Sequence, residues 1–150
     1  MPRATSHTGT IISIGYEGRT LDEFVDTLKQ HRVQVLIDVR LTPLSRKRGF
    51  SKTALSTALT DAGIDYRHEP ELGNPKDNRD AFRRGSTAAR SRYLRHLSNG
   101  ANTTYEATID AARTSRVALL CFERDHTQCH RSCITERAQD EHPALSVVRA

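Results

Sequence analysis

Two cysteines separated by a short polar loop are the strongest chemical signal in this sequence. An apolar run contains Cys121 and leads into Glu123, and after the loop Cys129 is followed directly by His130 and Arg131. If a helix begins at this second cysteine, backbone N–H groups and two basic neighbours surround its sulfur, which lowers a thiol pKa and also attracts anions. Cys129 is therefore the leading candidate nucleophile, and a buried structural cysteine is the alternative.

Two carboxylates stand within or just after apolar runs. Asp38 lies in the run at residues 33–39, and Glu123 follows the run that contains Cys121. A carboxylate in such surroundings is costly to bury unless it is paired. We expect the two either to hold neighbouring arginines in position or to act as catalytic acids or bases, with a pKa raised by burial.

Arginines in three separate loops could bind an anion together. The guanidinium group forms two parallel hydrogen bonds with phosphate or carboxylate, which a lysine cannot do. His68 and His130 could exchange protons near neutral pH, although structural roles are the common alternative. The predicted substrate-binding residues are Gly15, Arg40, Arg46, His68, Gly73, His130 and Arg131.

A metal site has weaker support from the sequence. Cys129 and Cys133 are spaced for one helix face, and Cys121, His126 and His130 are near them in the sequence, so this set could hold Zn²⁺. The spacing matches none of the usual paired CxxC patterns, and no GxGxxG or Walker A motif is present. We therefore predict no metal ligands and no cofactor.

Charge and composition favour an anionic partner. The 150 residues carry a formal charge of +5, and 19 of the 23 basic residues are Arg. Six of these lie in residues 79–96, where they could form a stripe along a nucleic-acid backbone or simply a solvated helix face. The predicted partner is a phosphate-bearing small molecule or a nucleic acid.

No feature of the sequence points to a membrane or to secretion. No apolar run approaches the roughly 20 residues of a membrane span, and residues 1–9 are polar and read as a flexible tail. Three cysteines without a secretory signal favour a reducing compartment. We expect a cytoplasmic protein with no membrane partner.

Strand and helix patterns alternate along the chain. Apolar, β-branched runs predict strands at residues 10–14, 33–39, 64–68 and 117–122, and residues 145–148 are expected to form either a last strand or an extended tail. Helical patterns cover residues 20–28, 51–62, 79–97 (interrupted at Gly85-Ser86), 105–113 and 130–140, and residues 69–80 read as a loop. In the first helix, Thr20 and Glu23 form a capping box.

This alternation predicts a single α/β domain over residues 10–150. Its sheet is open and mostly parallel, with about four to five strands and helices on both faces. Ligands bind such sheets beyond the carboxyl ends of the strands. The loops expected at that edge are residues 15–19, 40–50, 69–75 and 123–129, which are also the chemically richest parts of the chain.

Motifs in these loops resemble domain-of-unknown-function family 488, a group of small bacterial and archaeal proteins. The match spans residues 10–140. The motifs are Ile14-Gly15-Tyr16-Glu17-Gly18-Arg19 with Leu21 and Phe24; Asp38-Val39-Arg40, Pro43, Ser45-Arg46 and Phe50-Ser51-Lys52; Gly63-Ile64, Tyr66, His68 and Glu71-Leu72-Gly73; and Leu119-Leu120-Cys121, Glu123 and Cys129-His130-Arg131. The resemblance implies no particular reaction, because the family has no settled one.

The sequence thus favours a small enzyme. We expect it to bind a phosphate-bearing substrate in an Arg-rich pocket at the carboxyl edge of the sheet, with Cys129, Glu123 or Asp38 as the catalytic group. The alternative is a module that binds a nucleotide or nucleic acid without catalysis.

Overall fold

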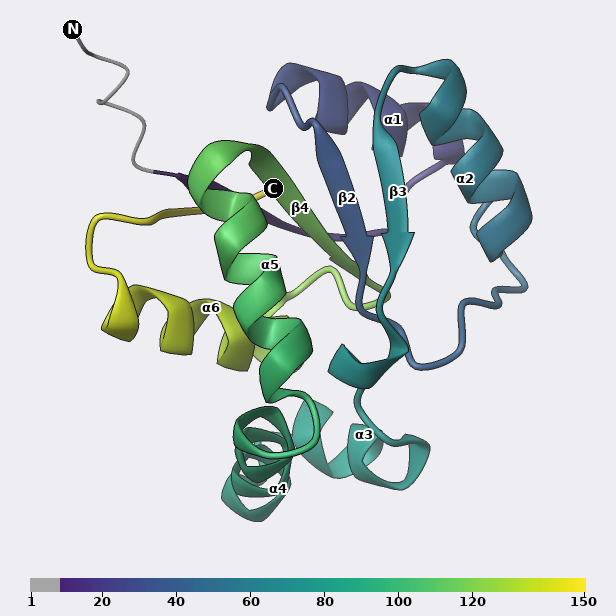
Figure 1. The fold of residues 1–150 in the computed structure, drawn as a ribbon. Helices are drawn as coiled ribbons and strands as arrows, with labels where there is room; N and C mark the ends of the chain where they lie inside the picture. Colours follow the sequence, from purple (N-terminus) through teal and green to yellow (C-terminus); the bar gives the residue numbers. More distant parts are fainter. Residues whose placement is uncertain (1–8) are drawn as a thin grey trace, which may run out of the picture.

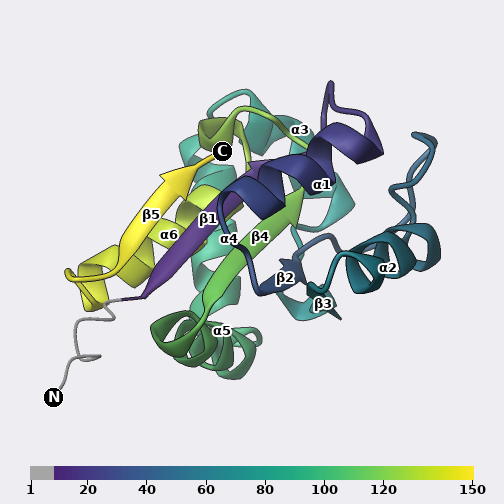
Figure 2. The same cartoon turned by 90° about the horizontal axis from the view of Figure 1, so that it is seen from above.

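Five parallel strands form one sheet at the centre of the structure. In the computed structural model, which describes residues 9–150, the strand order is β3-β2-β4-β1-β5, and all neighbouring strands are parallel (Figure 2). The strands are β1 (Thr10–Gly15), β2 (Val35–Asp38), β3 (Asp65–His68), β4 (Arg116–Cys121) and β5 (Ser146–Arg149). The predicted open α/β sheet is confirmed, and in the described residues it is wholly parallel.

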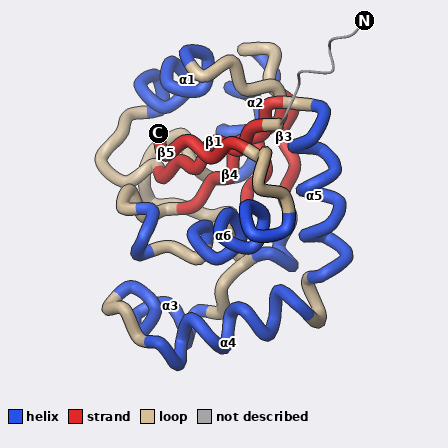
Figure 3. Tube along the Cα trace, turned by 90° about the vertical axis from the view of Figure 1, so that its left-hand side faces the viewer, coloured by secondary structure: helices blue, strands red, loops and turns tan. Residues whose placement is uncertain are grey.

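Six α-helices pack around the sheet: two cover each face, and α3 and α4 lie beyond the carboxyl ends of the strands (Figures 1 and 3). They are α1 (Leu21–Gln30), α2 (Lys52–Asp61), α3 (Lys76–Arg83), α4 (Thr87–Ser98), α5 (Asn102–Thr114) and α6 (Arg131–Glu141). Alternate strand residues point to opposite faces. Ile12 and Leu120 therefore pack against α1 and α2, whereas Ile11 and Leu119 pack into the core formed with α3 to α6.

The first helix begins where its sequence predicts. Thr20 Oγ1 accepts a hydrogen bond from the Glu23 backbone N–H at 3.1 Å, and the Glu23 carboxylate accepts one from the Thr20 N–H at 2.8 Å. This capping box satisfies two N–H groups that a helix start leaves free. It thereby fixes the point at which the chain turns away from the end of β1.

The segment at residues 69–80 differs from the loop predicted for it. A 3₁₀ turn (Pro70–Leu72) and the start of α3 at Lys76 occupy much of it. Pro75 precedes the helix, where its fixed φ and missing N–H cost nothing. The predicted break at Gly85-Ser86 is confirmed, because α3 ends at Arg83 and α4 begins at Thr87.

The chain leaves the strands toward opposite faces, and this opens a crevice at their carboxyl ends. β1 and β2 lead into α1 and α2 on one face, whereas β4, which lies between them, leads into α6 on the other. Such a reversal is where open parallel sheets bind ligands.

The described chain begins at Gly9, whose carbonyl accepts a hydrogen bond from the Ser146 N–H at 3.1 Å. The rest of the predicted tail, residues 1–8, lies outside the described residues. Among the helices that the structure describes, none has both the length and the apolar character required to cross a bilayer.

Candidate active site

A cavity of about 240 Å³ lies at the carboxyl edge of the sheet. Loops that follow β1, β2 and β4 contribute to its wall, together with α3 and the residues just before α6. The lining residues are Tyr16, Arg40, Leu41, Thr42, Leu44, Asn74, Arg79, Arg83, Cys121, Phe122, Glu123, Gln128 and His130. The cavity therefore includes three of the predicted site residues (Arg40, Glu123 and His130).

Arg40 is held by a buried ion pair with Asp38. The guanidinium Nε and Nη2 donate to the two carboxylate oxygens at 2.9 and 2.7 Å, and Nη1 donates to the Phe50 carbonyl at 2.6 Å. Tyr66 Oη donates to the same carboxylate at 2.6 Å. Burial acts to lower the pKa of Arg40, but the hydrogen bonds and charge of Asp38 outweigh it and raise this pKa. Asp38, with no exposed surface, thus holds Arg40 in position.

Cys129 lies in the most strongly polarised part of the site. Arg131 Nε donates to its sulfur at 3.2 Å, and His130 Nδ1 lies 3.6 Å from it. Arg131 also donates to the backbone carbonyl of Glu123. Cys129 and Arg131 are each 1% exposed, and neither lines the cavity. The cysteine that does line it is Cys121, at the end of β4.

The surroundings shift the pKa values of the two cysteines in opposite directions. Burial acts to raise the pKa of Cys129, but the hydrogen bond from Cys121 and the charges of His130 and Arg131 outweigh it, so this pKa falls well below its usual value. The pKa of Cys121 rises well above its usual value, because it hydrogen-bonds to Cys129 and is buried. Burial opposes ionisation of His130, yet the neighbouring Cys129 raises the pKa of its ring. One thiolate is therefore stabilised by donors on several sides.

Glu123 connects the thiol cluster, which consists of Cys121, Cys129 and His130, to an arginine on α3. Its Oε1 lies 3.7 Å from Cys121 Sγ, and its Oε2 accepts a hydrogen bond from Arg83 Nη2 at 2.8 Å. Arg83 also pairs with the exposed Asp80 at 3.2 Å. One turn earlier, Arg79 lines the cavity and donates through Nε to the Asn74 carbonyl at 3.0 Å. Within the described chain, no carboxylate lies in ion-pair range of Arg79, so its charge is available to a ligand.

Two predicted site glycines allow close backbone contacts. A Cβ atom at Gly15 would lie 1.9 Å from the Glu123 carbonyl oxygen, and one at Gly73 would lie 2.6 Å from the backbone of Leu41. Neither glycine lines the cavity. Gly15 instead lets the chain after β4 pass close to β1, which positions Glu123.

Two other predicted residues lie away from the cavity wall. Arg46 is exposed in the loop before α2. His68 is partly buried, and its Nε2 donates to the Arg40 carbonyl at 2.8 Å, so it supports the backbone of a cavity residue.

The cavity also contains residues to which sequence analysis gave no role in it. The sequence places Arg79 and Arg83 in a basic stripe for nucleic acid or a solvated helix face, but their spacing of four residues puts them side by side on α3. Cys121 enters the sequence analysis only as a possible zinc ligand. Its position at the end of a strand was the available signal.

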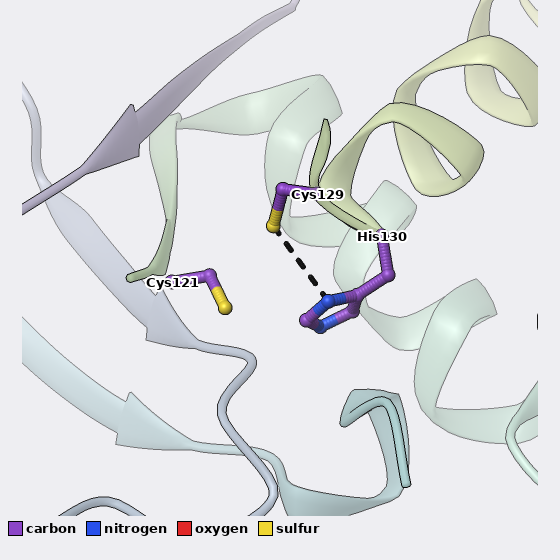
Figure 4. A group of neighbouring side chains, drawn as sticks. All are labelled: Cys121, Cys129 and His130. Carbon is purple, nitrogen blue, oxygen red and sulfur yellow. Dashed lines mark hydrogen bonds between the residues drawn. The ribbon is translucent and has the colours of Figure 1, made fainter. Parts of the chain in front are cut away.

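Three buried side chains could together hold a metal ion. The ligand atoms of Cys121, Cys129 and His130 all lie within 4.8 Å of one another (Figure 4). Two further residues of the zinc set considered from sequence, Cys133 and His126, are not in this group. His126 instead lies between the hydroxyl groups of Ser13 and Thr135, at 2.7 and 3.3 Å.

Comparison with known protein families gives one match. The sequence pattern of the family described as "Domain of unknown function DUF488" matches residues 20–138, which is most of the chain. Neither the comparison with curated proteins nor that with solved structures finds a match.

Proposed function

We propose that this chain, which belongs to the DUF488 family, is a small enzyme that binds a phosphate-bearing substrate in the cavity at the carboxyl edge of the sheet. One observation carries the proposal: the same cavity is bordered by arginines and by groups able to do chemistry. Arg79 and Arg83 line it together with Cys121, Glu123 and His130. Arginine side chains that converge on a reactive centre are typical of sites for phosphate esters.

The phosphate group would be bound mainly by α3. Arg79 has no carboxylate partner in the described structure, and Arg83 is 40% exposed, so its contact with Glu123 can be exchanged for one with a ligand. The charge of Arg40 is largely balanced by Asp38, so we assign Arg40 a lesser part in binding. Release of Arg83 by Glu123 would leave that carboxylate free to act as a general acid or base beside the thiol cluster.

The rim of the cavity favours a substrate with an apolar or aromatic part. Leu44 is 70% exposed and Phe122 41% exposed, and both line the opening beside the buried ring of Tyr16. Exposed apolar side chains beside cations suit a nucleotide or another phosphate ester better than inorganic phosphate. The volume, slightly below the roughly 300–1,000 Å³ of typical ligand sites, suits a small molecule or one end of a larger one.

The three free cysteines, all buried, support a reducing compartment such as the cytoplasm as the place where this enzyme works.

Binding is tested with nucleotides and simple phosphate esters at low salt, by calorimetry or NMR titration. We expect Arg79→Gln to weaken binding at least about tenfold, the loss of one charged hydrogen bond. The matched control is Arg84→Gln, which removes the same charge from an exposed residue at the end of α3. Failure of all phosphate esters to bind, or equal loss in both variants, would refute the assignment.

Catalysis is tested by following release of the alcohol or phosphate from a panel of such esters. Glu123→Gln should lower kcat about 100-fold or more with little change in KM, as expected for loss of a general acid or base. Asp80→Asn, which removes the other carboxylate paired with Arg83, is the control and should retain activity. Binding without turnover throughout the panel would favour the non-catalytic binding module.

A further inference from the structure

The three ligand atoms of the thiol cluster surround one common space. Cys121 comes from the end of β4, whereas Cys129 and His130 come from the residues directly before α6. Figure 4 shows the two sulfurs and the imidazole ring directed toward one another. All three residues are buried. Two soft sulfurs and an imidazole nitrogen are the ligands that zinc prefers in proteins.

The hydrogen bond on the far side of the His130 ring fixes its orientation. His130 Nε2 lies 2.9 Å from the Val39 carbonyl oxygen. A carbonyl oxygen only accepts, so Nε2 must carry a hydrogen atom, and Nδ1 is the nitrogen that can bind a metal. It is also the nitrogen that faces Cys129 Sγ. Histidines that bind metals usually donate their other N–H to a carbonyl or carboxylate in this way.

The distances already approach those of a tetrahedral site. Cys129 Sγ and His130 Nδ1 are 3.6 Å apart. A tetrahedral zinc ion, with bonds of about 2.3 Å to sulfur and about 2.05 Å to nitrogen, holds the two atoms about 3.6 Å apart. The two sulfurs lie at most 4.8 Å apart, and two sulfurs bound to one zinc lie about 3.8 Å apart, so Cys121 Sγ must move by no more than about 1 Å.

We propose that Cys121, Cys129 and His130 bind a Zn²⁺ ion whose fourth position faces the cavity. Cys121 and His130 both line the cavity, so the side of the cluster between them is the accessible one. Glu123 Oε1, 3.7 Å from Cys121 Sγ, stands beside that position. Three protein ligands and one accessible position are the arrangement of catalytic rather than structural zinc sites.

The surrounding charges are compatible with a divalent cation. Two thiolates balance the charge of the ion, and the guanidinium of Arg131 is also held by the backbone carbonyl of Glu123. Arg131 Nε donates to Cys129 Sγ at 3.2 Å, which leaves other lone pairs of the sulfur for the metal. Such outer hydrogen bonds orient metal ligands and tune the site.

The zinc site does not depend on the proposed function, because it can bind metal with no substrate present. If both proposals hold, the ion would supply a polarised water molecule or polarise a substrate oxygen where the cavity meets the cluster. Glu123 would then be placed to exchange a proton with it.

The test uses the full chain, freed of metal by a chelator and titrated with Co²⁺ as a spectroscopic substitute for zinc. We expect one Co²⁺ per chain, with the intense visible bands of tetrahedral cobalt and a thiolate-to-cobalt charge-transfer band, and we expect Zn²⁺ to abolish both. Cys129→Ser should weaken binding more than the 10–100-fold typical of outer-shell changes, and should lower the charge-transfer band. Cys133→Ser is the matched control and should bind as the unmodified chain does.

Absence of these bands in the unmodified chain would overturn the proposal, and so would equal loss in the Cys133→Ser variant. If Cys129→Ser fails to fold, the unmodified chain still decides the matter: Zn²⁺ must raise its melting temperature and slow the alkylation of its thiols. Arg79→Gln should bind Co²⁺ normally, so failure of phosphate binding and failure of metal binding can be told apart.

Discussion

Removing one member of the Asp38–Arg40 pair should cost far more stability than removing both charges. Asp38 has no exposed surface and Arg40 is 6% exposed, and two hydrogen bonds of 2.7 and 2.9 Å join them. Loss of one partner from such a buried pair costs about 3–5 kcal/mol, because the remaining charge is left without compensation in the interior. Asp38→Asn and Arg40→Met should each lower the free energy of unfolding by about this amount.

The double variant Asp38→Asn/Arg40→Met leaves no charge behind. In the unmodified chain, the Asp38 carboxylate accepts a hydrogen bond from the backbone N–H of Arg40 at 3.1 Å. The side-chain amide that replaces it can still accept this hydrogen bond, and it can hydrogen-bond Tyr66 Oη. The double variant should therefore lose less stability than either single variant, so the summed loss from the single variants should exceed its loss by about 3 kcal/mol or more. Urea unfolding, followed by circular dichroism, measures all four proteins.

An exposed pair provides the control cycle. Asp77 and Arg92 lie 3.1 Å apart, with 76% and 45% of their side chains exposed. Their coupling should stay below about 1 kcal/mol. The reasoning is refuted if the losses of unfolding free energy in the Asp38→Asn and Arg40→Met variants sum to that of the double variant within about 0.5 kcal/mol. If the single variants do not fold, recovery of folding in the double variant is the confirming result, and its failure to fold refutes the argument.

Three further predictions concern the packing and titration of the site. Gly15→Ala should lower the free energy of unfolding by about 1–3 kcal/mol, measured by thermal or urea unfolding, because its Cβ would lie 1.9 Å from a backbone oxygen. Gly100→Ala, whose Cβ contacts are 3.7 Å or longer, should cost far less, and equal losses would contradict the packing argument. In chelator-treated protein, Arg131→Met should raise the pKa of Cys129, because it removes a hydrogen bond and a positive charge from the thiolate. Thiolate absorbance measures this in a background without the other two cysteines, and an unchanged pKa would show that the arginine does not stabilise the thiolate. Burial, with nearby arginine charges, lowers the pKa of His126 to about 4, so its contribution to stability is present above its unfolded pKa of about 6.5 and is lost as the pH falls through 4. Chelator-treated His126→Gln should therefore lose less stability between pH 7 and 4 than the unmodified chain, and parallel curves of stability against pH would contradict this.

The sequence by itself determined the elements and the edge of the sheet at which to look. Apolar runs alternate with helical patterns, and this alternation alone requires a parallel sheet with its loops gathered at one edge. Thr20 and Glu23 fixed the start of α1, and Gly85-Ser86 fixed the break between α3 and α4, because capping and helix breaking are local effects.

Only the tertiary structure decided which charged groups at that edge pair with each other and which line the cavity. Arg40 lines the cavity but is neutralised by Asp38, and Arg131 contacts the sulfur of Cys129 outside the cavity, so the arginines of α3 contribute most of the remaining positive charge of the cavity wall. The order of the strands and the packing of α3 and α6 bring these groups together from distant parts of the chain. Charge pairing and burial act through space, over distances that spacing along the sequence does not encode, and they select which arginine is left for a ligand and which sulfur faces the cavity.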